Sequence, residues 1–201
     1  MPFNAAPFEI IAAPFTVYIA PTGTAFPQID VTPGGSWTKV GTSGDLNYAE
    51  DGVKVKHDHS VDFWTALGDP GPRKAFRTKE MLHISLVLAD LTLEQYALAL
   101  NYNTVTAGST DLGAGTKKIG MTRGPNLLQR ALLVRGPSAY GDDFTAQYEV
   151  PQAVQIAAPE LVFRRNEPAG IALEWAALVD PNASSTDERF GRLVMQTDEA
   201  T

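Results

Sequence analysis

The sequence predicts a mainly β fold: an antiparallel β-sandwich or barrel that is flanked by one α-helix and carries an extended arm and a long loop. Glycine and proline gather in clusters that separate many short runs, which is typical of strands joined by turns. Several runs alternate apolar and polar side chains, as segment 144–150 does. With 44% hydrophobic residues among 201, the chain can bury the core of one large domain.

Four strands are predicted in the first third of the chain, at 15–19, 37–40, 46–50 and 53–63. The first ends at Pro21, which begins a loop rich in proline, glycine and threonine. The dipeptide Asp51-Gly52 joins the last two runs. An Asp-Gly pair between alternating runs is a strong hairpin signal, because both turn residues need a positive φ. The sequence therefore predicts that 46–50 and 53–63 form a hairpin.

The run 53–63 alternates for an unusual length. Valines, histidines and Phe63 fall on one face, whereas lysines, aspartates and a serine fall on the other. A Gly/Pro break at 68–72 ends the run, and the basic stretch 73–79 leads from it to a buried strand predicted at 81–88.

One helix is predicted, from residue 92 to about residue 101. Thr92 and Gln95 match a capping box, in which each side chain hydrogen-bonds the backbone amide of the other residue. Leu91 and Tyr96 occupy the positions of a hydrophobic staple, and Glu94 lies in the first turn, where the helix dipole favours an anion.

The second half of the chain returns to β patterns. They lie at 117–121, 127–135, 144–150, 160–179 (interrupted near Pro168) and 192–195. In 144–150 the alternation predicts apolar side chains inside and polar side chains outside. We expect an extended N-terminal arm at 1–14, one β-sandwich domain at 15–180 and a C-terminal arm at 181–201.

Charge and composition exclude several classes of protein. The net charge of −7 and the pI near 4.9 disfavour a protein that grips nucleic acid electrostatically. The absence of cysteine excludes disulfides, thiolate zinc sites and cysteine nucleophiles. The start of the chain lacks the basic residues of a secretory signal, and no run approaches the length of apolar residues that spans a bilayer. We expect no membrane association, and assembly in a cytoplasm.

No set of residues makes a persuasive active site, so we expect no enzyme, no cofactor and no metal. His57 and His59 share a strand face, but the alternating residues beside them are valines and Phe63, which leaves no third metal ligand. His83 lies within a predicted strand and is better explained as a packed or interfacial histidine. The acidic pairs at 142–143 and 187–188 fall in predicted turns.

Three stretches together resemble the tail tube (major tail) proteins of long, non-contractile bacteriophage tails. The first is 37–52, where a tryptophan precedes a short strand, a glycine turn and a strand with an acidic end. The second is 77–95, a strand that runs into a capped helix, and the third is 171–192. The match covers most of residues 37–192, and it consists of strand and helix patterning. The long N-terminal arm and the stretch 103–115 depart from it.

This resemblance implies a structural virion protein whose hexameric rings stack into a hollow tube, through which the DNA genome passes without specific binding. The other partners would be the tail terminator, tape measure and distal tail proteins. Segment 57–79 would be a loop or hairpin that reaches the next ring. Its expected contact residues are His57, His59, Trp64, Arg73, Lys74 and Arg77.

Six copies at −7 give a formal charge of about −42 per ring, and an acidic lumen would keep DNA from adhering to the channel. Glu149 and Glu174, on the polar faces of late strands, are the candidate residues that face the lumen. Exposed glutamates on the outer surface are the alternative explanation for both.

Three alternatives remain open. The first is the tube protein of a contractile injection or secretion system, and the second is another virion subunit, such as a tail terminator or a capsid decoration protein. The third is a β-barrel ligand-binding protein or an enzyme with a dispersed site, which a deep pocket with converging polar groups would favour.

Overall fold

The computed structural model describes residues 9–109 and 112–198, and the described chain is mainly β. Its regular structure includes one antiparallel sheet of eight strands, a second sheet of two short strands, a single α-helix, α1 (Leu93–Ala99), and short 3₁₀ helices at Gly44–Asn47 and Thr186–Glu188. The strands are β1 (Thr16–Pro21), β2 (Thr38–Lys39), β3 (Lys54–Thr65), β4 (Pro72–Leu88), β5 (Thr106–Ala107), β6 (Lys117–Lys118), β7 (Gln129–Ser138), β8 (Gly141–Gln155), β9 (Ile171–Ala177) and β10 (Arg192–Met195). The predicted fold class is confirmed.

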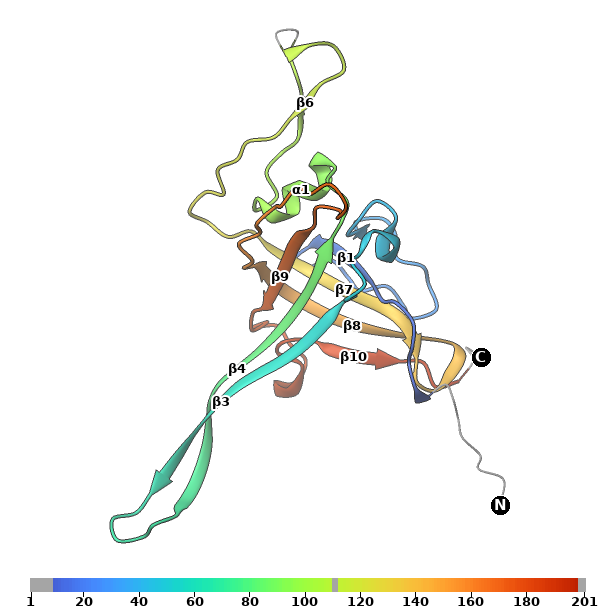
Figure 1. The fold of residues 1–201 in the computed structure, drawn as a ribbon. Coiled ribbons are helices and arrows are strands. Elements are labelled where there is room, and N and C mark those ends of the chain that lie inside the picture. The colour runs from blue at the N-terminus through green and yellow to red at the C-terminus, as the bar shows by residue number, and fades with distance from the viewer. Residues whose placement is uncertain (1–8, 110–111, 199–201) are drawn as a thin grey trace.

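Strand β8 joins the two halves of the large sheet, whose order is β2-β1-β7-β8-β9-β4-β3 (Figure 1). Its first half pairs with β10, through residues 146–149, and its last three residues pair with β9. Pro151 lies between these two halves, where the register with β7 shifts. A proline cannot donate a ladder hydrogen bond, so it is tolerated at such an irregularity.

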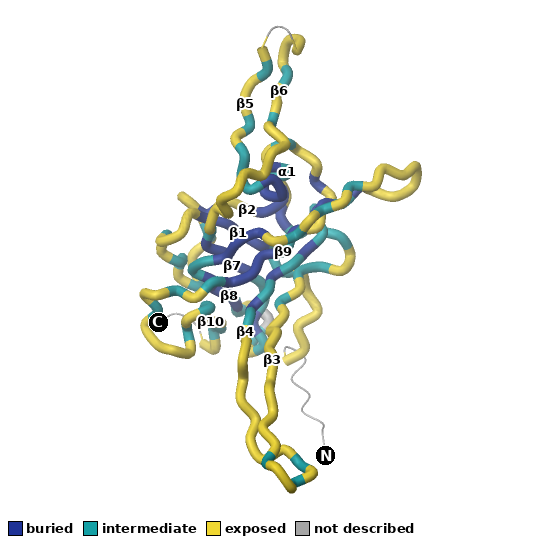
Figure 2. The backbone as a smooth tube through the Cα atoms, turned by 90° about the vertical axis from the view of Figure 1, so that its left-hand side faces the viewer, coloured by how far each residue is buried: buried dark blue, intermediate teal, exposed yellow. Residues whose placement is uncertain are grey.

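The main core lies between the two halves of the sheet. Leucines and isoleucines of β4 and β9 pack there with Trp175 against apolar residues of β1, β7 and β8, and Leu98 of α1 joins them. Trp175 is fully buried, and its indole nitrogen donates to the Tyr102 hydroxyl at 3.1 Å. Figure 2 shows this buried centre with exposed chain extending from it at both ends.

A smaller cluster covers the opposite face of β1 and β7. Tyr18 and Leu133 pack there with Trp37, and Phe26 from the loop after β1 lies against them. Arg135 anchors this loop, because its guanidinium donates to the carbonyls of Gln28, Ile29 and Val31. Strands β1 and β7 are therefore buried on both faces, which explains their nearly continuous runs of apolar residues.

The predicted hairpin around Asp51-Gly52 is wrong. Residues 44–47 form a 3₁₀ helix instead of a strand, and Asn47 Oδ1 accepts from the Ser43 amide at 2.6 Å. Tyr48 makes only an isolated bridge to Leu88. Gly52 has a positive φ and closes a turn with Ala49. A turn therefore forms at Gly52, but it does not join two paired strands. β3 pairs instead with β4, over a longer stretch of residues.

The true hairpin is formed by β3 and β4. The break at 68–72 lies at its tip as expected, since β3 ends at Thr65 and β4 begins at Pro72. The strand predicted at 81–88 is nine residues longer than expected on its N-terminal side, because the basic stretch is part of β4. Charged side chains are compatible with a strand that is exposed on both faces.

The helix forms where it was predicted, but the capping box is wrong. Thr92 occupies the N-cap position, yet its side chain makes no capping hydrogen bond. Gln95 Oε1 accepts from the Gly41 amide at 2.8 Å instead. The Thr92 amide donates to Asp90 Oδ1, and Asp90 Oδ2 accepts from the Thr42 amide. Asp90 and Gln95 therefore join the helix to the loop after β2.

The remaining strands differ from prediction mainly in length. The run predicted at 117–121 is reduced to the two residues of β6, which pairs with β5 in a finger at the end of the molecule opposite the hairpin (Figure 1). Only β9 forms within 160–179. The expected C-terminal arm contains β10, a strand of the large sheet. Residues 1–8 of the expected N-terminal arm, and 199–201, lie outside the described residues.

Asp90 provides a test of the helix junction. Burial opposes ionisation of this carboxyl, but hydrogen bonds from Thr42 and Thr92 outweigh it and lower its pKa from 3.8 to about 2. A carboxyl with a lowered pKa stabilises the fold at pH values above about 4, and this contribution is lost as the pH falls towards 2. The shift corresponds to about 2 kcal/mol. In Asp90→Asn we expect a free energy of unfolding lower by about 1–2 kcal/mol at pH 7.

Urea unfolding between pH 7 and pH 2.5 measures this effect, and the difference between the two proteins should shrink as the pH falls. Asp62→Asn, at an exposed position of β3, is the matched control. A gap between wild type and Asp90→Asn that stays constant over this pH range would contradict the assignment.

Candidate functional site

The β3–β4 hairpin projects from the body of the molecule. Every residue of β3 from Lys56 onward, and of β4 as far as Glu80, is exposed. The side-chain hydrogen bonds and ion pairs of residues 56–80 all stay within that range, as in Arg73 with Asp69 and Arg77 with Glu80. Figures 1 and 2 both show the hairpin extending away from the sheet. We call residues 56–80 the projecting hairpin.

The projecting hairpin leaves backbone edges unpaired. Within the described chain, β3 pairs only with β4, so its outer edge has no partner strand. β4 pairs with β9 only from His83 onward, so its outer edge is also unpaired over residues 72–82. Bulges shift the register after Ser60 and after Trp64. Bulges of this kind increase the local twist of a strand, and a twisted edge pairs less readily with strands of unrelated chains.

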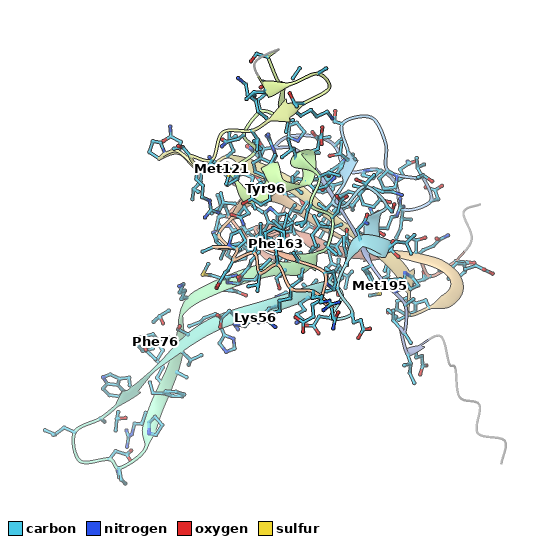
Figure 3. All side chains as sticks on the ribbon, turned by 45° about the horizontal axis from the view of Figure 1, so that its top comes forward. Lys56, Phe76, Tyr96, Met121, Phe163 and Met195 are labelled. Carbon is cyan, nitrogen blue, oxygen red and sulfur yellow. The ribbon has the colours of Figure 1, made fainter. Side chains whose placement is uncertain are left out.

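Large apolar side chains are exposed along the hairpin. Trp64, Phe63 and Phe76 have exposed fractions of 54%, 65% and 46%, and Leu67 at the tip is fully exposed. Figure 3 shows Phe76 on the hairpin, away from the side chains of the body. Exposed apolar clusters of this kind mark interaction surfaces more often than isolated exposed residues do.

All six predicted contact residues lie on this hairpin and are exposed: His57, His59, Trp64, Arg73, Lys74 and Arg77. The register places His57 and His59 on one face, whereas Trp64 lies opposite Lys74 on the other. The structure therefore brings the six residues to one projecting element but divides them between its faces. Their role in contacts between rings stays a prediction.

Metal-binding residues do not gather in the described part of the chain. No group of three or more His, Asp or Glu side chains there has the geometry to hold an ion. His57 pairs across the ladder with Leu82, and His59 with Glu80.

Glu174 lies on the outward face of β9, where its side chain is 41% exposed. Its Oε1 lies 2.9 Å from His83 Nδ1 on β4. The expectation that His83 is a packed histidine agrees with this contact, since its side chain is only 14% exposed. Glu174 remains a candidate for a surface that lines a channel.

The prediction that Glu149 faces a lumen is wrong, as is its alternative, an exposed outer glutamate. Glu149 is only 3% exposed, and Gln147, on the same face of β8, is 1% exposed. The alternation in 144–150 predicted that this face is exposed. The loop at 26–30 packs against this face, and Arg192 of the neighbouring strand β10 pairs with Glu149 there. Neither contact can be anticipated from the sequence of β8.

Glu149 belongs to a buried polar cluster. Arg192 Nε of β10 donates to Glu149 Oε2 at 2.7 Å, and Gln147 Nε2 donates to Glu149 Oε1 at 2.5 Å and to the Pro27 carbonyl at 3.0 Å. The ion pair raises the pKa of Arg192 above its ordinary value. The amide oxygen of Gln147 is buried, and no described residue donates a hydrogen bond to it.

Two adjoining pockets flank this cluster, and Phe26, Glu149 and Arg192 line both of them. Their volumes are about 480 and 230 Å³. Their charged lining consists of five carboxylates and one guanidinium, from Asp30, Glu149, Asp180, Glu188, Asp198 and Arg192. We call this region the acidic cleft. Sequence reasoning missed it, because its residues come from four separate segments.

Two comparisons with known sequences identify no family for this chain. A scan against protein-family models finds none that matches, and a search of curated proteins finds no similar sequence. In the described residues, no helix has the length and apolar character needed to cross a membrane.

Arg192 is the only cationic partner of buried Glu149 among the described residues. In Arg192→Met the carboxylate keeps its bond to Gln147 but loses its countercharge. We expect the free energy of unfolding to fall by about 1–3 kcal/mol, which urea denaturation measures. Arg189→Met, at a nearby exposed position, should change it by less than about 0.5 kcal/mol. Equal effects of the two substitutions would show that the ion pair contributes nothing.

Proposed function

We propose that this chain is a structural tube subunit of a virion, whose copies join into hexameric rings that stack into a hollow tail tube for the DNA genome. The single observation that carries the proposal is the projecting hairpin: a long two-stranded element that packs against nothing else in its own described chain. An isolated two-stranded hairpin is at best marginally stable in water. A partner surface outside the molecule would stabilise this element.

The unpaired edges and exposed aromatic side chains support assembly with other copies. Open strand edges and exposed apolar side chains invite association, and natural proteins cover them in the functional state. In a closed ring of subunits, neighbouring sheets complete one another's edges. The resemblance of 77–95 and 171–192 to tail tube proteins supplies the specific form of this assembly, whereas the strand expected at 46–50 within the first stretch does not form.

Symmetry also favours a ring or a filament. If the projecting hairpin binds a different surface of the next copy, the contact is heterologous. Contacts of this kind propagate, either closing into a ring or continuing as a helical array. In a tube of stacked rings, both the hairpin and the surface that binds it would be covered by neighbouring copies.

The charge of the chain is compatible with the passage of DNA. A net charge of −7 per copy repels phosphate, so a tube with an acidic lining would let DNA slide without adhering. Glu174 is the remaining candidate for such a lining, because its side chain is partly exposed on the outward face of β9. Terminator, tape measure and distal tail proteins are the further partners that this function requires.

The first test is direct observation of the purified protein. We expect rings or tubes in negative-stain electron microscopy, with their fraction rising with protein concentration. Sedimentation velocity provides an independent measure of particle size. A protein that stays monomeric at every concentration and salt tested would contradict the proposal.

The second test removes the end of the projecting hairpin. Phe63 and Ala75 pair across the ladder, so replacing residues 64–74 by an Asn-Gly turn closes a shorter hairpin in register. We expect an unchanged far-ultraviolet circular dichroism spectrum and cooperative unfolding, together with loss of tubes. As a control, Leu67→Ala alters the exposed tip and keeps the length. Tubes formed by the shortened protein would show that the hairpin has no role in stacking.

A further inference from the structure

The acidic cleft has the properties of a receptor for a basic segment. We propose that it receives the β4 strand of the projecting hairpin from a second copy of this chain, with Lys74 entering beside Gln147. This inference rests on the proposed function, in which copies assemble through the hairpin, and it names the surface to which the hairpin binds. Four observations support it: charge, an unsatisfied acceptor, the shape of the cleft and the distance from the molecule's own hairpin.

The charges of the two surfaces are complementary. Residues 72–79 of β4 carry two arginines, which pair with Asp69 and Glu80 of the same hairpin, and two lysines. Lys74 and Lys79 make no ion pair in the described chain. The acidic cleft has the opposite balance, with five carboxylates against Arg192. Complementary charge of this kind steers association and sets the register of a contact.

The buried amide of Gln147 requires a donor. Its nitrogen lies between two groups that only accept, the Pro27 carbonyl and the Glu149 carboxylate. Exchanging the amide oxygen and nitrogen would place the oxygen against both acceptors, so these two contacts fix its orientation. The oxygen is then left without a donor from residues 9–109 or 112–198, and a buried acceptor in this state is destabilising. An ammonium group supplies three N–H donors.

The lining of the cleft suits a lysine with its aliphatic stem. Phe26, Ile29 and Val194 provide apolar surface along the larger pocket, and Asp30 and Asp198 lie at exposed positions of its lining. A lysine side chain packs its methylene groups on apolar surface and keeps its charged end among polar groups. Trp64, which lies opposite Lys74 in the ladder, would bring an exposed indole to the same cleft.

The occupant is a second copy because the molecule's own hairpin does not reach the cleft. None of the residues that line the two pockets belongs to the projecting hairpin. Figures 1 and 2 show its tip well separated from β10, which forms one wall of the cleft. The hairpin and the cleft are different surfaces, so their contact is heterologous and extends from copy to copy.

A charge swap tests the pairing. We expect Lys74→Glu and Asp30→Lys, each alone, to raise the protein concentration needed for assembly by about tenfold, because each places like charges across the contact. The double variant should return to within about threefold of wild type, since it restores an opposite pair. Lys118→Glu changes the net charge equally on β6 and serves as the matched control. Independent effects, with no rescue in the double variant, would overturn the proposal.

Cross-linking tests the same contact by a different readout, which is the proximity of residues 30 and 74 and not the concentration needed for assembly. The chain has no cysteine, so each introduced thiol is unique. A mixture of Asp30→Cys chains and Lys74→Cys chains, treated with a short bis-maleimide, should yield the mixed dimer. A mixture of Asp30→Cys and Lys118→Cys chains should not.

The outcomes separate this inference from the proposed function. Tubes that form without the Asp30–Lys74 cross-link would overturn the receptor assignment and leave the tube function intact. A protein that forms neither assemblies nor the cross-link would contradict both. A cross-link that appears equally with Lys118→Cys would show that contacts at the cleft are unselective, and it would also overturn the assignment.

Discussion

The structure depends on the length and double pairing of β8. This strand holds β10 along its first half and β9 along its last residues, while β7 follows it on the other side. Pro151 marks the change of partner. Because β9 positions β4, β8 determines where the projecting hairpin leaves the body. The same strand carries Gln147 and Glu149 into the acidic cleft. One strand therefore organises both surfaces through which we propose that copies meet.

The apolar core of the molecule is buried, whereas strand edges and polar groups at the two proposed contact surfaces lack partners within the described chain. The centre is a cluster of buried apolar side chains around Trp175, Leu132 and Leu173. Within the described chain the hairpin, in contrast, has unpaired edges, exposed aromatic rings and two lysines, Lys74 and Lys79, without an ion pair. A buried amide oxygen that receives no hydrogen bond from the described part of the chain lies at the other proposed surface. Buried polar atoms and strand edges are normally satisfied in functional states, so these features together favour a subunit over a self-sufficient monomer.

Sequence patterns located most elements but not their partners. The alternation at 53–63 and the break at 68–72 placed one arm and the tip of the projecting hairpin, and all six residues expected at its contacts are exposed there. The Asp51-Gly52 signal named the wrong partner for β3, because a local turn motif carries no information about which distant strand competes for the edge. The capping box failed for the same reason: the Gly41 amide, distant in sequence, takes the Gln95 side chain.

By itself, the sequence determined the β-rich class, the single helix and the long exposed alternation, because these follow from the period of apolar residues and from turn chemistry within short windows. Only the tertiary structure decided that Glu149 is buried, that β10 belongs to the sheet and that an acidic cleft exists. The physical reason is that burial of a polar strand face depends on what packs over it. For β8 these groups are the loop 26–30 and the Arg192 side chain of the neighbouring strand β10, which lie far away in sequence and meet β8 only when the sheet has formed.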